Sequence, residues 1–167
     1  MNHRLCLVLV SCSCSLVFSL THGQDRIPLG LAGPVNNLVF TEGTPGVYSI
    51  RTTGGDPWVV CGRVAQSFDH DRVSVLTFDY RSPDGIPSFH VYIGPQFGEH
   101  GTYAAGKLPA ASEWKPFSGN LADTPGGGWS AAINEFRLDV GDEEGIELEI
   151  RGLALRPMTD EEADAQR

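Results

Sequence analysis

Cysteine is scarce in this sequence. It has four cysteines, but Cys6, Cys12 and Cys14 lie in an apolar leader, and Cys61 is alone in the rest of the chain. The domain that follows the leader therefore cannot form an internal disulfide. Cys61 lies in the apolar run 58–64, where an unpaired cysteine is typically a small buried hydrophobe and not a reactive thiol.

Cations are also under-represented. The sequence has 12 Lys and Arg against 21 Asp and Glu, which gives a formal net charge of -9 at pH 7. Phosphate binding depends on clustered cations, so this balance argues against a nucleic acid or an anionic membrane as partner. The charge balance does not exclude neutral sugars or cations as ligands.

The motifs of common enzymes are missing too. The chain has no His-Glu-x-x-His, no Gly-x-Ser-x-Gly, no phosphate loop and, after the leader, no Cys-x-x-Cys. Glu99 and His100 could act as a base or a metal ligand, but neighbours in a glycine-rich loop rarely converge without further partners. Carboxylate pairs for glycoside cleavage stay open, because their separation of ~5 to 9 Å is a property of the folded chain. We therefore expect a protein that is not an enzyme.

The longest apolar stretch lies in the leader and is short. A basic start at Arg4 precedes apolar residues to Leu20 and then small or polar residues to Gly23, the pattern of a secretion signal. The stretch is shorter than the ~20 residues of a spanning helix, so we expect no membrane insertion. Residues 1–23 are predicted to be removed, leaving a secreted or periplasmic protein. Lipid anchoring at Cys12 is a weaker alternative, because the apolar stretch before it is very short.

Short alternating segments fill the rest of the chain. The central stretch, 73–94, shows two of them around a turn at 82–85, which predicts a hairpin with one apolar and one polar face. A stretch from 95 to 109 has few strand signals, and Pro116 predicts an edge strand or a bulged position. The further strands are expected at 38–40, 47–52, 58–64, 113–121, 136–140 and 146–155.

This pattern predicts an all-β fold, an antiparallel β-sandwich of the jelly-roll type. We assign residues 24–37 to an extended lead-in and 38–157 to the sandwich. Residues 159–162 match a capping box, Thr-x-x-Glu, which predicts the start of a helix. The segment 158–167 is thus either a polar helical tail or a truncated linker that leads to another domain in longer relatives.

The polar face of the strands is the candidate binding surface. Arg, Asp, His and Tyr side chains beside an aromatic ring can hold sugar hydroxyls and the apolar face of a pyranose. A solvated sheet face with cross-strand ion pairs would show the same pattern. Trp58 and Trp114 are expected to plug the core ends, and Trp129 to expose its ring. The predicted ligand-binding residues are Asp79, Arg81, His90, Tyr92, Trp129 and Arg137.

Four segments resemble galactose-binding-domain-like jelly rolls, modules found beside catalytic domains in secreted bacterial polysaccharide-degrading proteins. These segments are 48–58, 75–80, 113–117 and 150–156. The resemblance implies non-catalytic binding of a polysaccharide or glycan, or a spacer role. Such modules often hold a structural calcium ion, for which Glu42, Asp139 and Asp142 could supply oxygens here; no cofactor is required.

Three hypotheses follow. The first is a secreted, non-catalytic carbohydrate-binding module, which in longer relatives would accompany a catalytic domain. The second is a structural or protein-interaction sandwich that binds no sugar, which an extended apolar patch would favour. The third is a small glycan-active hydrolase using Glu99, His100 or acids of the sheet face, which two convergent carboxylates in a cleft would favour.

Overall fold

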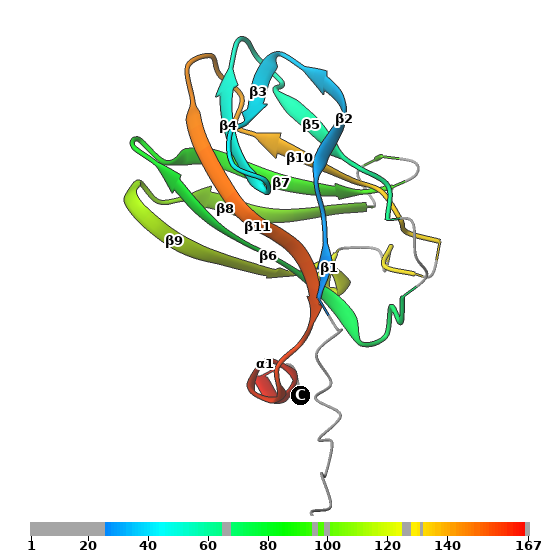
Figure 1. Cartoon of the computed structure of the whole chain (residues 1–167). Coiled ribbons are helices and arrows are strands. Elements are labelled where there is room, and N and C mark those ends of the chain that lie inside the picture. Colours follow the sequence, from blue (N-terminus) through cyan, green and yellow to red (C-terminus); the bar gives the residue numbers. More distant parts are fainter. Residues whose placement is uncertain are drawn as a thin grey trace, which may run out of the picture.

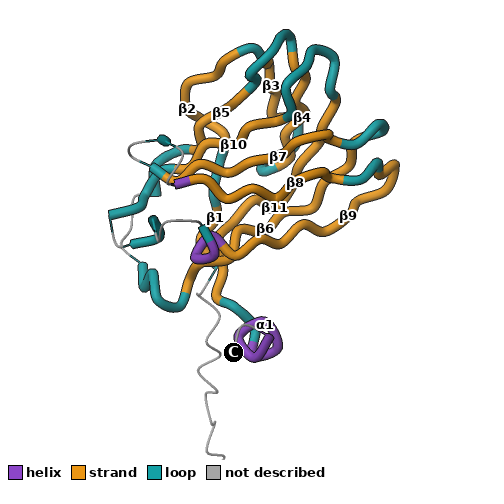
Figure 2. The backbone as a smooth tube through the Cα atoms, turned by 180° about the vertical axis from the view of Figure 1, so that it is seen from behind, coloured by secondary structure: helices purple, strands orange, loops and turns teal. Residues whose placement is uncertain are grey.

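The chain folds into two antiparallel sheets packed face to face (Figure 1 and Figure 2). The computed structural model describes residues 26–64, 68–94, 97–98, 101–124, 128–130 and 132–165. Sheet A contains, in order, β3 (Leu38–Glu42), β4 (Val47–Thr52), β11 (Glu147–Pro157), β6 (Val73–Ser82) and β9 (Ala111–Asn120), with β1 (Ile27–Pro28) beside β11. Sheet B contains, in order, β2 (Leu31–Asn36), β5 (Trp58–Cys61), β10 (Phe136–Val140), β7 (Ile86–Ile93) and β8 (Thr102–Leu108). The predicted antiparallel β-sandwich is confirmed.

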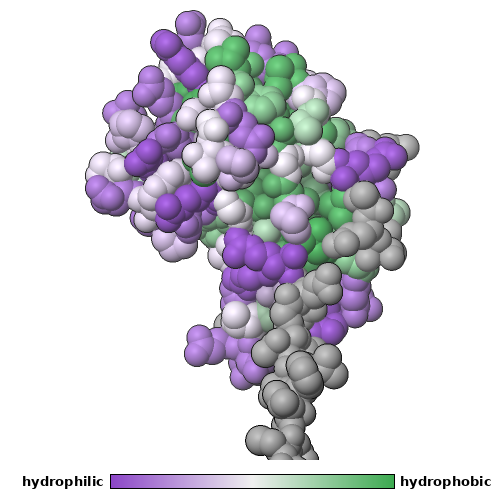
Figure 3. Space-filling model, viewed as in Figure 1, coloured by the Kyte–Doolittle hydropathy of each residue, from purple (hydrophilic) through white to green (hydrophobic). Residues whose placement is uncertain are grey.

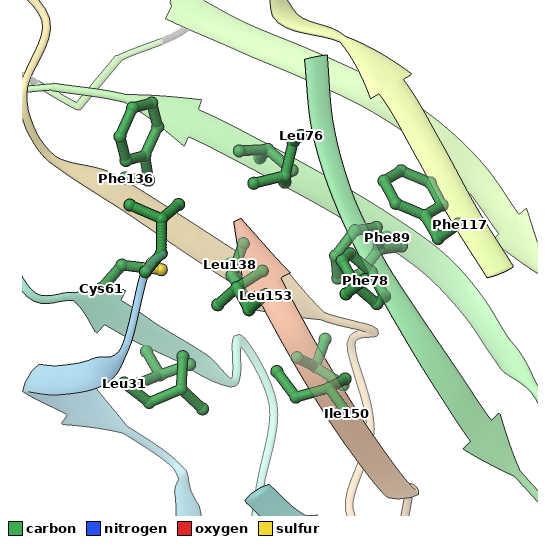
Figure 4. Packing of buried hydrophobic residues seen from close by; sticks show 14 of the residues in the cluster. Leu31, Cys61, Leu76, Phe78, Phe89, Phe117, Phe136, Leu138, Ile150 and Leu153 are labelled. Carbon is green, nitrogen blue, oxygen red and sulfur yellow. The ribbon is translucent and has the colours of Figure 1, made fainter. Parts of the chain in front are cut away.

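The core lies between the sheets and is built from the alternate residues of each strand. The apolar face predicted for the stretch 73–94 is buried as expected. Phe78 of β6 meets Phe89 of β7 and Phe117 of β9 at the centre of this layer (Figure 4). The six residues of that face are all almost completely buried: Leu76, Phe78, Tyr80, Phe89, Val91 and Ile93.

The hairpin predicted for the same stretch is wrong. β6 pairs with β11 and β9, whereas β7 pairs with β10 and β8, so the turn at 82–85 carries the chain from sheet A to sheet B. Gly85 has a φ of 77°, and a Cβ there would lie 2.6 Å from the carbonyl oxygen of Leu108. Only glycine fits this tight corner. The two apolar faces meet across the core instead of side by side.

Two other predictions about strands need correction. The lead-in 24–37 is not outside the domain: β1 joins sheet A and β2 joins sheet B, so the described sandwich begins at β1. The stretch 95–109 contains β8, which the sequence did not signal because Ala104, Ala105 and Gly106 have low β propensity. By contrast, Pro116 does lie on an edge strand, β9.

Cys61 is buried on the inner side of β5. Burial raises the pKa of its thiol to about 12, so the thiolate that a reactive cysteine needs is not formed near neutral pH. The prediction of a small buried hydrophobe is confirmed.

The capping box forms as predicted and starts α1 (Asp160–Ala165). The Glu162 backbone N–H donates to Thr159 Oγ1, and the Thr159 backbone N–H donates to a Glu162 carboxylate oxygen at 2.8 Å. Arg156 of β11 also donates to both carboxylate oxygens of Glu162, at 2.7 and 2.8 Å, which holds α1 against the sheet. Within the described ranges, no helix is long and apolar enough to cross a membrane.

Acid should release this helix. The hydrogen bonds from Arg156, and then those from Thr159, lower the pKa of Glu162 from its ordinary 4.5 to about 2. A lowered pKa means that the contact stabilises the folded state above pH 4.5 and is lost as the pH falls through about 2. We expect the Ala163 amide, which donates to the Thr159 carbonyl at 2.9 Å, to shift in NMR spectra with a midpoint well below 4.5. Glu162→Gln should remove that titration; a midpoint near 4.5 in the wild type would contradict it.

Candidate ligand-binding groove

The six predicted ligand-binding residues do not form one site. Asp79 and Arg81 lie on the outer face of sheet A, while His90, Tyr92 and Arg137 lie on the outer face of sheet B. The reason is the corner at 82–85, which separates β6 from β7. The sequence pattern assigned both polar faces to one surface, and the structure places them on opposite sides of the sandwich.

A cavity of about 550 Å³ opens on the outer face of sheet A. We call it the groove; its volume is within the range of small-ligand sites. It crosses neighbouring strands near the first residues of β11 and β9 and the last residues of β6, where hydrophilic residues gather on the left of Figure 3. Its lining residues are Val39, Phe40, Thr41, Ser49, Ile50, Arg51, Arg81, Pro83, Ala111, Ser112, Glu147, Leu148 and Glu149.

One ion pair spans the groove. Arg81 of β6 donates through Nε to Glu149 of β11, and Ser49 Oγ of β4 donates to the other Glu149 oxygen at 3.4 Å. The hydrogen bond that Arg81 donates to Glu149 raises the pKa of Arg81 further above its ordinary value. The groove therefore contains one fixed cation and one fixed anion.

Arg51 and Glu147 also line the groove and are exposed. They lie opposite each other in the register of β4 and β11. Neither makes a side-chain hydrogen bond or ion pair to the residues that the structure describes. A guanidinium offers five N–H donors and a carboxylate offers two acceptor oxygens, so this pair is available to hydroxyl groups of a ligand.

Trp114 lies on the same outer face as Arg81. The prediction that it plugs an end of the core is therefore wrong. The Arg81 guanidinium lies 4.7 Å from the centroid of its ring and the Arg151 guanidinium lies 4.4 Å from it. Arg151 in turn donates to Asp79 at 3.0 Å. These side chains form a row that ends at the groove.

The outer face of sheet B carries a closed cluster. Arg137 donates to both oxygens of Asp139, at 2.8 and 2.7 Å, and its guanidinium lies 4.1 Å from the ring centroid of Tyr92 and 5.2 Å from that of Trp58. Only 18% of the Arg137 side chain is exposed. Burial raises the pKa of Asp139, although Arg137 acts in the opposite direction. Trp58 therefore belongs to this face and not to a core end, and the cluster satisfies its own charges.

Trp129 is half-buried and does not present an open ring. Its indole N–H donates to the His70 carbonyl at 2.8 Å, and the ring packs against Phe68, His70 and Phe136. The predicted exposed indole is wrong, because contacts from distant segments cover a side chain whose glycine-rich neighbours suggested an open loop.

The three residues proposed for calcium do not converge. Glu42 accepts the backbone N–H of Gly46 in the turn after β3, at 2.6 Å, Asp139 is held by Arg137 on sheet B, and Asp142 follows β10. In the described part of the chain, no three His, Cys, Asp or Glu residues lie close enough to hold a metal ion. Glu99 and His100 lie outside the described residues.

Sequence reasoning missed Ser49, Arg51, Glu147 and Glu149 as site residues. Their alternation placed them on the polar face, but only the pairing of β4 with β11 and of β11 with β6 brings them together. The alternation of polar residues therefore predicted the face on which these side chains lie, but nothing in the sequence predicted that they meet in one groove.

Solved structures share this fold. A family 29 carbohydrate-binding module from Piromyces equi matches at a TM-score of 0.58 and 6% identity, over 83% of this chain and 89% of its own. A family 29 module complexed with cellulohexaose matches at 0.53 and 14% identity, over 75% of this chain and 79% of its own. PfGH50B matches at 0.59 and 12% identity over 78% of this chain and 23% of its own.

No protein-family model and no curated protein matches the sequence. Identities this low establish a common architecture and leave the ligand open. The chain has the jelly-roll β-sandwich fold seen in carbohydrate-binding modules.

Proposed function

We propose that this protein is a secreted, non-catalytic module that binds a segment of a neutral polysaccharide in the groove of sheet A. The observation that carries the proposal is the groove itself, where Arg51 and Glu147 lie opposite each other in the register of two strands and have no hydrogen-bond or ion-pair partner among the described residues. Secretion rests on the signal pattern of residues 1–23.

The chemistry of the groove suits sugar hydroxyls and the apolar face of a sugar ring. Val39 is 57% exposed, and together with Pro83 it gives the groove an apolar surface beside its polar groups. In the lining of the groove, the carboxylates of Glu147 and Glu149 balance the guanidinium groups of Arg51 and Arg81. A groove with balanced charges in a protein of net charge -9 favours neutral over polyanionic chains. The cellulohexaose complex of a similarly folded module supports a linear neutral glycan as the ligand class.

Affinity gel electrophoresis of the protein without residues 1–23 tests the proposal. Gels cast with hydroxyethylcellulose, galactomannan, xylan or polygalacturonate should show retardation by at least one neutral polysaccharide and none by polygalacturonate. A protein that no polysaccharide retards would overturn the proposal, and selective retardation by polygalacturonate would overturn its neutral class.

A hydrolase is the second candidate, because two carboxylates line the groove. Glu147 and Glu149 are two positions apart on one face of β11, which corresponds to roughly 6.5 to 7 Å, within the ~5 to 9 Å of glycosidase pairs. However, Glu147 is exposed and Glu149 is paired with Arg81, so neither has the apolar surroundings that keep a general acid protonated. Release of reducing ends from a retained polysaccharide, lost in Glu147→Gln, would favour this candidate.

Packing against a partner protein has less support. In the described ranges the exposed large hydrophobic residues are Val35 on sheet B and Val39 on sheet A. They are not an extended apolar patch, which is the feature that would favour a docking face.

A further inference from the structure

A continuous row of five side chains leads from the middle of sheet A to the groove. Asp79 accepts from Arg151, Arg151 lies against the ring of Trp114, Trp114 lies against Arg81, and Arg81 donates to Glu149. The row consists of four charged side chains with one indole in the middle, and its residues belong to β11, β6 and β9.

Only one end of this row reaches the groove. Arg81 and Glu149 line the cavity, whereas Asp79, Trp114 and Arg151 do not. Trp114 is half-buried, and its π surface already carries two guanidinium groups at 4.7 and 4.4 Å. A sugar ring that stacked on Trp114 over the face that carries these guanidinium groups would have to displace them.

We propose that Trp114 is a positioning residue that acts through Arg81 and does not itself contact the ligand. This inference rests on the proposed glycan binding. The ring fixes the plane of the Arg81 guanidinium while Glu149 fixes its direction through Nε. The two terminal nitrogens of Arg81 retain four N–H donors, which make no bond to the described residues and are available to the ligand.

Holding Arg81 in place before binding reduces the conformational entropy that binding would otherwise cost. An arginine side chain has many rotamers to lose, and 41% of this one is exposed. The pair Asp79–Arg151 supports the arrangement, because Arg151 lies against the same ring. Asp79, predicted from the sequence to bind ligand, thereby acts on it only through three intervening residues, Arg151, Trp114 and Arg81.

A double-mutant cycle on affinity tests this role, with the neutral polysaccharide that retards the wild type, among hydroxyethylcellulose, galactomannan and xylan, as the probe. Arg81→Met should raise the dissociation constant about tenfold, because it removes a charged hydrogen-bond donor. Trp114→Ala should raise it roughly three- to fivefold, and Trp114→Phe less, since phenylalanine keeps a π face. The double variant should bind no more weakly than Arg81→Met alone.

Trp58→Ala is the matched control, because Trp58 also lies against an arginine but on sheet B. It should leave the dissociation constant unchanged while thermal unfolding confirms that all variants fold. If the double variant shows the product of the two single-variant increases in dissociation constant, Trp114 contacts the sugar independently of Arg81. That result would overturn the inference but not the proposal of glycan binding. A Trp58→Ala loss as large as that of Trp114→Ala would overturn it as well, and absence of wild-type retardation overturns both proposals.

Discussion

The free energy of unfolding is expected to fall by about 3–5 kcal/mol when Phe78 is replaced with alanine. Phe78 is only 1% exposed, and its ring stacks on Phe117 at 4.6 Å and meets Phe89 edge-on at 5.7 Å (Figure 4). The alanine variant leaves a cavity where three strands from both sheets converge, and strands fixed by hydrogen bonds cannot collapse fully into it. Urea denaturation followed by circular dichroism measures the change.

Two controls separate the cavity from other causes. Phe78→Leu keeps most of the apolar volume and should lose clearly less than the alanine variant. Val39→Ala removes an exposed side chain from the same sheet and should change the free energy by no more than about 0.5 kcal/mol. A loss below about 1 kcal/mol for Phe78→Ala would show that these rings do not organise the core.

Alternation along the chain was enough to predict which residues of β6 and β7 are buried. This succeeds because the period of a strand is local: each second residue faces the same side whatever the neighbouring strand is. The predicted pairing of β6 with β7 was wrong, because a four-residue turn permits either a hairpin or a corner between sheets. The partner that decides between them, β11, begins 65 positions after the end of β6.

The sequence predicted only part of the site, because alternation is local and strand pairing is not. Asp79 and Arg81 do lie on the face that holds the groove, but the groove needs β4 and β11 beside β6, and no local pattern encodes that register. The predictions for all three tryptophans were wrong, because the exposure of an indole depends on contacts from distant segments. Trp114 is covered by arginines from β6 and β11, and Trp129 is held by a carbonyl of residue 70.

The largest effect on binding is expected from filling the groove. Ser49 is exposed on β4, lines the cavity and lies opposite Glu149 of β11. Ser49→Trp places an indole where the ligand should lie, and we expect the dissociation constant to rise on the order of a hundredfold, which corresponds to about 2.7 kcal/mol. Stability should change little, because the position is exposed and aromatic residues suit strands. Affinity electrophoresis with the retained neutral polysaccharide measures the effect.

The matched control is Ala104→Trp, the same bulk added to an exposed position of β8 in sheet B. Ala104 lies opposite His90, on the face to which the sequence assigned His90, Tyr92 and Arg137 as ligand residues. If the groove is the site, Ala104→Trp binds like the wild type and Ser49→Trp does not. The reverse result would move the site to sheet B and would require the ligand to open the Arg137–Asp139 pair. Because that pair is largely buried, such binding would carry a desolvation cost that the exposed Arg51 and Glu147 do not impose.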